Sequence, residues 1–227
     1  MRRIRVKICC IASPEEAHLA AGAGADLLGL VGPMPSGPGT LSLAEAGRIA
    51  RTAPPWARPV LLTAAETAAA IAGEARAAGV DTVQVVRHIA PAEAARLAAT
   101  GLHAIQVIHV EGPEALRLIP AYAPHVAAFL LDSGRPSEGA LGGTGRVHDW
   151  QVSRAFVLQS PKPVFLAGGL GPENAQRAIL EVRPFGLDIC SGLRRGAAKA
   201  LDPERLSAFM AAVGEAANML AASPGDG

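Results

Sequence analysis

The sequence predicts a single α/β domain, a (β/α)8 TIM barrel, and three observations lead to that fold class. The chain has 227 residues, a length at which one α/β barrel fits as a single domain. Eight short apolar segments alternate with longer alanine-rich segments of helical period. No early G-x-G-x-x-G motif supports the alternative, an open doubly wound sheet. We therefore expect residues 1–222 to form the barrel and residues 223–227 to be a disordered tail.

The eight predicted strands are apolar at nearly every position, as strands buried on both faces must be. They cover approximately residues 4–10, 26–31, 59–62, 82–86, 104–109, 126–131, 163–167 and 186–190. The first and last helices have clear starts, because Ser13-Pro14 and Asp202-Pro203 each pair an N-cap residue with proline at the first helical position. Gly79, which precedes a strand, marks a helix end.

Composition narrows the possible partners and the location. The 21 basic and 20 acidic residues give a net charge of +1, so we expect neither nucleic acid nor a membrane as partner. No segment has the length and apolar character of a signal peptide or membrane span, which predicts a cytoplasmic protein. Three cysteines cannot form a disulfide framework and match no zinc spacing, so we expect no metal. The sequence leaves open whether the protein is a monomer or a homodimer.

Alternation along the first strand separates its polar residues from its apolar ones. Period two puts Lys7 and Cys9 on one face and Cys10 on the other. The outer face of a barrel strand packs against helices, so we expect Lys7 and Cys9 to face the barrel interior and Cys10 to pack outside. Cys9 is either a small buried hydrophobe or a reactive thiol next to a lysine, which favours the thiolate. Asp188, on the neighbouring eighth strand, is the expected partner of buried Lys7, a pair with a structural role.

Polar and glycine-rich segments follow strands 6, 7 and 8. Asp132 ends strand 6, where a carboxylate either takes part in catalysis or caps a turn, and the loop after it contains Gly143 and Arg146, which are available to bind an anion. Gly168-Gly169 and Ser191-Gly192 follow strands 7 and 8. Glycine turns in these adjacent units allow backbone N–H groups to approach a phosphate.

Together, these motifs resemble the phosphoribosylanthranilate isomerase family over almost the entire chain. The matching segments are Val6-Lys7-Ile8-Cys9, Leu131-Asp132, Gly142-Gly143-Thr144-Gly145, Ala167-Gly168-Gly169-Leu170, and Asp188 with Ser191-Gly192. The resemblance implies an intramolecular oxidoreductase, an aldose-ketose isomerase of tryptophan biosynthesis that performs an Amadori rearrangement without a cofactor. It also implies that Cys9 is the general base, that Asp132 is the general acid, and that the turns at Gly168-Gly169 and Ser191-Gly192 bind the substrate phosphate.

The sequence departs from the family pattern in three places, one of which is the end of strand 4, where the family's Gln-Leu-His-Gly is represented only by Gln84-Val85-Val86-Arg87-His88. Cys10 occupies the position of a family glycine, and the loop 32–41 lacks the arginine that helps hold the anthranilate carboxylate, which leaves Arg87 or Arg146 as possible replacements. The leading hypothesis is therefore an isomerase of N-(5-phosphoribosyl)anthranilate. The alternatives are a divergent member that isomerises another phosphorylated sugar or aminoaldose, and a barrel that binds a phosphosugar without catalysis.

Overall fold

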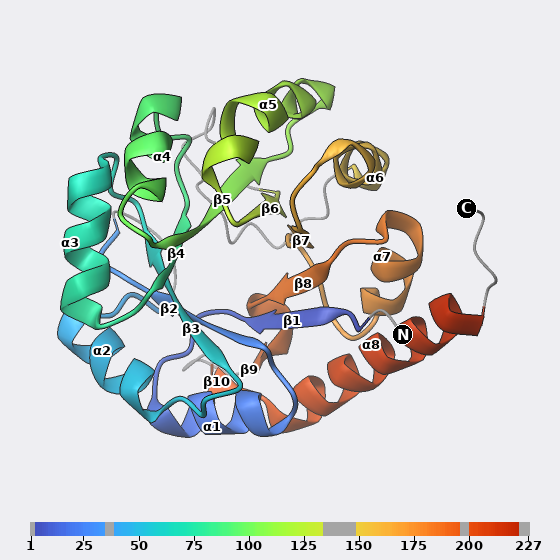
Figure 1. Cartoon of the computed structure of the whole chain (residues 1–227). Helices are drawn as coiled ribbons and strands as arrows, with labels where there is room; N and C mark the ends of the chain where they lie inside the picture. The colour runs from blue at the N-terminus through green and yellow to red at the C-terminus, as the bar shows by residue number, and fades with distance from the viewer. Residues whose placement is uncertain (1–2, 35–38, 134–148, 196–199, 223–227) are drawn as a thin grey trace.

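The computed structural model describes residues 3–34, 39–133, 149–195 and 200–222 of the chain. Eight parallel strands form a closed barrel in sequence order, and helices surround them (Figure 1). The barrel closes between its first and last strands, where Lys7 is paired in register with Asp188. The predicted (β/α)8 barrel is confirmed. The expected tail 223–227 and two predicted anion-binding residues, Gly143 and Arg146, lie outside the described residues.

All eight predicted strands are present, with ends that differ by a few residues. They are β1 (Arg5–Ile8), β2 (Leu27–Val31), β3 (Arg58–Thr63), β4 (Thr82–Val85), β5 (His103–His109), β6 (Ala128–Asp132), β7 (Val164–Leu166) and β8 (Gly186–Ile189). Cys9 and Cys10 lie just beyond the end of β1. Asp132 is the last residue of β6, at the carboxyl end of the barrel, where side chains of parallel strands converge on one opening.

The helices follow the strands, and the first and last begin where the sequence predicts. They are α1 (Pro14–Gly22), α2 (Leu43–Thr52), α3 (Ala68–Ala78), α4 (Pro91–Ala98), α5 (Ile119–Tyr122), α6 (Trp150–Gln159), α7 (Ala175–Val182) and α8 (Pro203–Ala222). Ser13 accepts a hydrogen bond from Glu16 N–H as the N-cap of α1, and Asp202 accepts two from the first turn of α8. Gly79 ends α3 with φ +65°.

The helical segment that follows β5 is irregular. Between β5 and β6 the chain forms the 3-10 helix η1 (Pro113–Leu118), the four-residue α5 and the 3-10 helix η2 (Ala123–His125). Pro113, Pro120 and Pro124 lack backbone N–H groups, so a single regular helix cannot run through this segment. Tyr122 anchors it instead, because its hydroxyl donates to Ile89 O at 2.6 Å.

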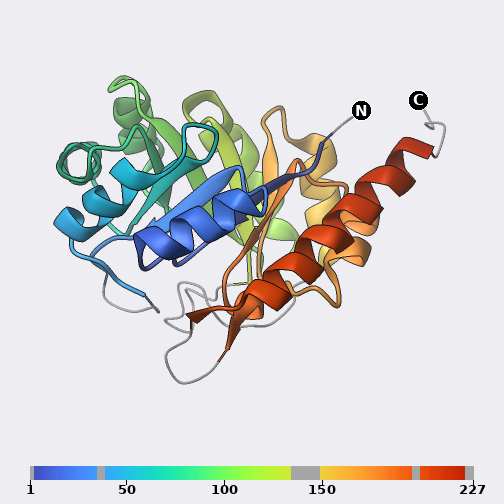
Figure 2. The same ribbon diagram turned by 90° about the horizontal axis from the view of Figure 1, so that it is seen from below.

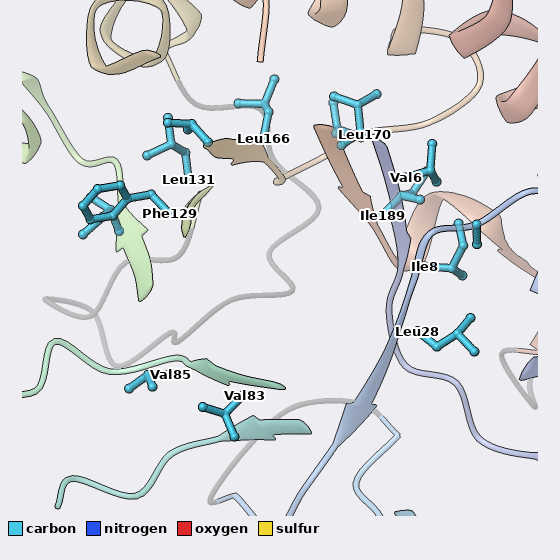
Figure 3. Close-up of a cluster of buried hydrophobic side chains, with 14 of the residues drawn as sticks. Val6, Ile8, Leu28, Val83, Val85, Phe129, Leu131, Leu166, Leu170 and Ile189 are labelled. Atoms are coloured by element: carbon cyan, nitrogen blue, oxygen red, sulfur yellow. The ribbon is translucent and has the colours of Figure 1, made fainter. Parts of the chain in front are cut away.

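Two apolar layers stabilise the barrel. The layer between strands and helices contains side chains from the outward faces of the strands, and Figure 3 shows part of it: Val6, Ile8, Leu28, Val83, Val85, Phe129, Leu131, Leu166, Leu170 and Ile189. The inner layer contains residues of opposite parity, among them Val60, Ile105, Val107, Leu130 and Phe165. The alternation of side chains along each strand therefore determines which residues point into the barrel, including the polar ones.

A short hairpin connects β8 to the last helix. After β8 the 3-10 helix η4 (Ser191–Leu193) leads into β9 (Arg194–Arg195), which pairs antiparallel with β10 (Ala200–Leu201). The hairpin lies at the same end of the barrel as the start of α8 (Figure 2). In the parts of the chain that the structure describes, no helix combines the length and apolar character needed to cross a bilayer.

Candidate active site

Lys7 and Asp188 form a buried ion pair inside the barrel, as the sequence predicts. The Lys7 ammonium lies 2.9 Å from both carboxylate oxygens of Asp188, and the two residues are 0% and 7% exposed. Burial by itself lowers the pKa of Lys7, but attraction to Asp188 outweighs this effect and raises that pKa, so Lys7 stays charged. The pair holds the Lys7 ammonium in a fixed position below the carboxyl end of the barrel.

Cys9 lies beside this ammonium group. Its backbone N–H donates to Ile189 O at 2.8 Å, which extends the pairing of β1 with β8 by one residue. Gly29 on β2 leaves the space for the thiol, because a Cβ there would lie 2.9 Å from Cys9 Sγ and 3.0 Å from Lys7 Nζ. The buried Cys9 belongs to the inner apolar layer, so its predicted inward orientation is confirmed.

The prediction that Cys10 packs outside the barrel is wrong. Cys10 belongs to the same inner layer as Cys9, and its thiol contacts the thiols of Cys9 and Cys190. The reason is local: β1 ends at Ile8, and Cys10 has φ +61°, so strand alternation does not reach it. This left-handed backbone explains why glycine suits the position, because a Cβ makes that conformation unfavourable. Interaction with the Cys190 thiol raises the pKa of Cys10 and lowers that of Cys190.

Asp132 combines partial exposure with an environment that favours its neutral form. Its side chain accepts a hydrogen bond from Ser133 N–H at 2.8 Å. Burial raises the pKa of Asp132, and the Asp188 carboxylate adds to this effect, whereas the Ser133 N–H, His109 and Lys7 lower it by less. A carboxyl group with a raised pKa can retain its proton near neutral pH and donate it.

The two predicted phosphate turns contact each other. Gly168 and Gly169 adopt φ +83° and +62°, and Asn174 closes the turn by donating to Gly169 O and accepting from Gly171 N–H, both at 2.9 Å. A Cβ on Gly192 would lie 2.1 Å from Leu170 O, so the second turn packs directly against the first. None of the described residues accepts a hydrogen bond from the backbone N–H groups of Gly168 or Gly169. Ser191 begins η4 next to them.

Arg194, which the sequence analysis missed, connects the β1 and β8 ends of the barrel. Its guanidinium pairs with Glu16 at 3.0 Å and donates to the carbonyl oxygens of Cys9, at 3.1 Å, and Cys10. Glu16 in turn accepts from Ala12 N–H at 3.0 Å. The segment that carries Cys9 is therefore held from both sides. The contact joins residues 178 positions apart, and no local pattern indicates it.

His109 is the second residue that sequence analysis did not single out. It ends β5 beside Asp132, and its Nε2 lies 2.9 Å from Val86 O. The His88 ring lies next to it, with ring centroids 5.4 Å apart and the ring planes tilted by 38°. A position at the end of a strand that faces the barrel interior is the signal that would have identified His109. Arg87, a candidate for carboxylate recognition, forms an ion pair with exposed Glu66 at 3.1 Å.

Comparison with known proteins identifies the family. The model of the N-(5′-phosphoribosyl)anthranilate (PRA) isomerase family matches residues 6–212, which span most of the chain. The chain belongs to the PRA isomerase family. A relative named N-(5′-phosphoribosyl)anthranilate isomerase 2, from Methanosarcina mazei, is 37% identical over 194 residues, 84% of this chain and 86% of the relative. The isomerase of Thermosynechococcus vestitus is 34% identical, with 95% of this chain and 92% of the relative covered.

Solved structures of PRA isomerases have the same fold. The enzyme from Thermus thermophilus superposes with a TM-score of 0.80 at 27% identity, covering 93% of this chain and 99% of that one. Another family structure, in complex with reduced 1-(o-carboxyphenylamino)-1-deoxyribulose 5-phosphate, superposes with a TM-score of 0.79 at 25% identity and the same coverage. The predicted family resemblance is confirmed over nearly the full length of the described barrel.

Proposed function

We propose that this protein isomerises N-(5′-phosphoribosyl)anthranilate to 1-(o-carboxyphenylamino)-1-deoxyribulose 5-phosphate, a step of tryptophan biosynthesis. Family membership over residues 6–212 supports the reaction. The observation that carries the assignment to this site is the placement of two reactive groups at one opening of the barrel. Cys9 belongs to the inner layer beside Lys7, and Asp132 ends β6 two positions after the inward-facing Leu130, so a candidate base and a candidate acid face the same barrel opening.

The reaction divides into two proton transfers. Asp132 protonates the furanose ring oxygen, the C1′–O4′ bond breaks, and the anilino nitrogen lone pair forms the C1′=N bond. Cys9, as thiolate, then removes the C2′ proton, and the released electron pair gives an enolamine. The enolamine becomes the aminoketose when O2′ loses its proton and C1′ gains one, and proton exchange with solvent returns Cys9 and Asp132 to their starting states. C1′ is reduced while C2′ is oxidised, so the electrons balance within the substrate. In this mechanism Lys7 keeps a positive charge next to the thiolate.

We assign the substrate phosphate to the paired turns after β7 and β8. The N–H groups of Gly168 and Gly169 donate to no described residue and are available to an anion, and Gly192 brings the second turn, with Ser191, against the first. The anion-binding role of Gly143 and Arg146 remains a prediction. The cytoplasmic location and the choice between monomer and homodimer also stay predictions.

A fluorescence assay with enzymatically generated phosphoribosylanthranilate tests the proposal. The wild-type protein should turn the compound over, and Cys9→Ser and Asp132→Asn should each lower kcat by at least about a hundredfold, the usual contribution of a positioned acid or base. Asp81→Asn is a matched control, because Asp81 is exposed at the opposite end of the barrel, before β4. Absence of turnover at high enzyme concentration would show that the proposed substrate is wrong.

A divergent activity on another phosphorylated sugar is the second candidate. The observation in its favour is the loop 32–41, which contains no basic residue to bind the anthranilate carboxylate. Transfer of a substrate C2 proton to solvent, followed by NMR in deuterated water with several aminoaldose phosphates, separates the candidates. Exchange with a compound that lacks the carboxylate, at a rate equal to that of phosphoribosylanthranilate, would favour the divergent activity. Phosphosugar binding with no exchange would indicate a binding protein.

A further inference from the structure

Within the described parts of the chain, one ring nitrogen of His109 has a hydrogen-bond partner and the other has none. Its Nε2 lies 2.9 Å from Val86 O, and because a carbonyl oxygen can only accept, Nε2 carries the hydrogen. When the imidazole is neutral, this contact leaves a lone pair on Nδ1. The residue is 5% exposed, and Nδ1 is buried with no hydrogen-bond partner among the described residues. A buried acceptor without a donor is unfavourable, which indicates that a bound molecule provides one.

The ring faces the interior of the barrel. Ile105 and Val107 belong to the inner layer, so His109, two positions further along β5, has inward parity. It is paired in register with Asp132. The His109 side chain therefore points into the barrel next to the proposed acid, on the strand opposite β1 and Cys9.

We propose that His109 Nδ1 binds the substrate by accepting a hydrogen bond from a sugar hydroxyl next to the position that Asp132 protonates. This inference rests on the proposed function. A hydroxyl is the donor that phosphorylated sugars offer in number, and a neutral imidazole accepts from it without carrying charge into the site. Val86 O holds the ring in one tautomer, so the acceptor is prepared before the substrate arrives.

Two amide substitutions separate the roles of the two nitrogens. His109→Asn places a polar amide group near the position of Nδ1 and loses the contact with Val86 O. His109→Gln reaches the position of Nε2 and leaves the position of Nδ1 empty. If Nδ1 binds substrate, His109→Asn should retain kcat/KM within about threefold and His109→Gln should lose about ten- to a hundredfold, the range for one lost hydrogen bond that leaves its partner unpaired.

Stability and a second histidine provide the controls. Both variants should unfold cooperatively, and His103→Gln, at the exposed start of the same strand, should keep wild-type kinetics. A larger loss of kcat/KM in His109→Asn than in His109→Gln would assign the effect to the Val86 contact and overturn the proposal. Equal wild-type kinetics in both variants would overturn it as well.

A readout independent of turnover separates failure of this inference from failure of the proposed function. In protein labelled with 15N-histidine, saturating ribose 5-phosphate should shift the His109 Nδ1 resonance, because the lone pair gains a donor. If the wild type fails to turn over phosphoribosylanthranilate but this shift occurs, the proposed substrate is wrong and the role of His109 stands. If turnover occurs and neither ribose 5-phosphate nor reduced 1-(o-carboxyphenylamino)-1-deoxyribulose 5-phosphate shifts the resonance, the proposed role of His109 is wrong.

Discussion

Lys7→Met should strongly destabilise the barrel, because it leaves the carboxylate of Asp188 buried without its partner. Lys7 is fully buried, and its ammonium contacts both oxygens of Asp188 at 2.9 Å. Removal of one member of such a pair costs about 3–5 kcal/mol. For a chain of this size each kcal/mol corresponds to roughly 2–4 °C in Tm, so we expect a decrease of about 6–20 °C.

Urea unfolding of four proteins measures this effect: wild type, Lys7→Met, Asp188→Leu and the double variant. The double variant should lie within about 2 kcal/mol of wild type, because apolar replacement of a complete buried pair is often neutral. Glu181→Gln is the control, since it removes an ion pair with Arg177 in which the side chains are 67% and 52% exposed, worth less than about 1 kcal/mol. A loss below about 1 kcal/mol in Lys7→Met, at unchanged m-value, would refute the reasoning.

Three further predictions concern the residues around the opening. Asp132 has a raised pKa, so the folded state retains its proton to higher pH than the unfolded state does. The kcat of the wild type should therefore fall as pH rises through that raised pKa. Asp132→Asn should become more stable than wild type at pH values well above 3.8, as measured by urea unfolding at several pH values. Arg194→Met should destabilise the protein by about 1–3 kcal/mol, because Glu16 loses its ion pair but keeps the hydrogen bonds from Ala12 and Leu201 N–H. It should also lower kcat by releasing the Cys9 carbonyl, whereas unchanged kcat would show that Arg194 does not position the base. At Cys10, glycine should be more stable than alanine by about 1 kcal/mol in thermal unfolding, the reverse of their usual order, because φ is +61°.

Strand-level features were predictable because they depend on local periodicity. Alternation along β1 correctly directed Lys7 and Cys9 inward, and closure of the barrel then made Asp188 the partner of Lys7. The same rule failed one residue later, at Cys10, where the strand had ended and the backbone turned left-handed. Periodicity predicts side-chain direction only while the extended conformation continues, and the sequence does not mark its last residue sharply.

Contacts between loops were not predictable for a different reason. Arg194 and Glu16 belong to segments that meet only because the barrel closes, and each looks like an ordinary charged residue near a turn or helix start. His109 is similar: a histidine at a strand end becomes informative only when the pairing of β5 with β6 brings it beside Asp132. Such residues acquire significance from their surroundings, which the closed fold provides.

The division between strands and loops also bears on substrate choice. Cys9 follows β1, Asp132 ends β6 and His109 ends β5, so the groups assigned to the chemistry are fixed by the hydrogen bonding of the barrel. Recognition of the anthranilate carboxylate falls to loops, and the loop 32–41 lacks a cation. Arg87 pairs with Glu66, which is 69% exposed, so exchange of that partner for a substrate carboxylate would carry little penalty. A barrel of this kind can therefore keep its acid and base while the charge that selects the substrate moves from one loop to another.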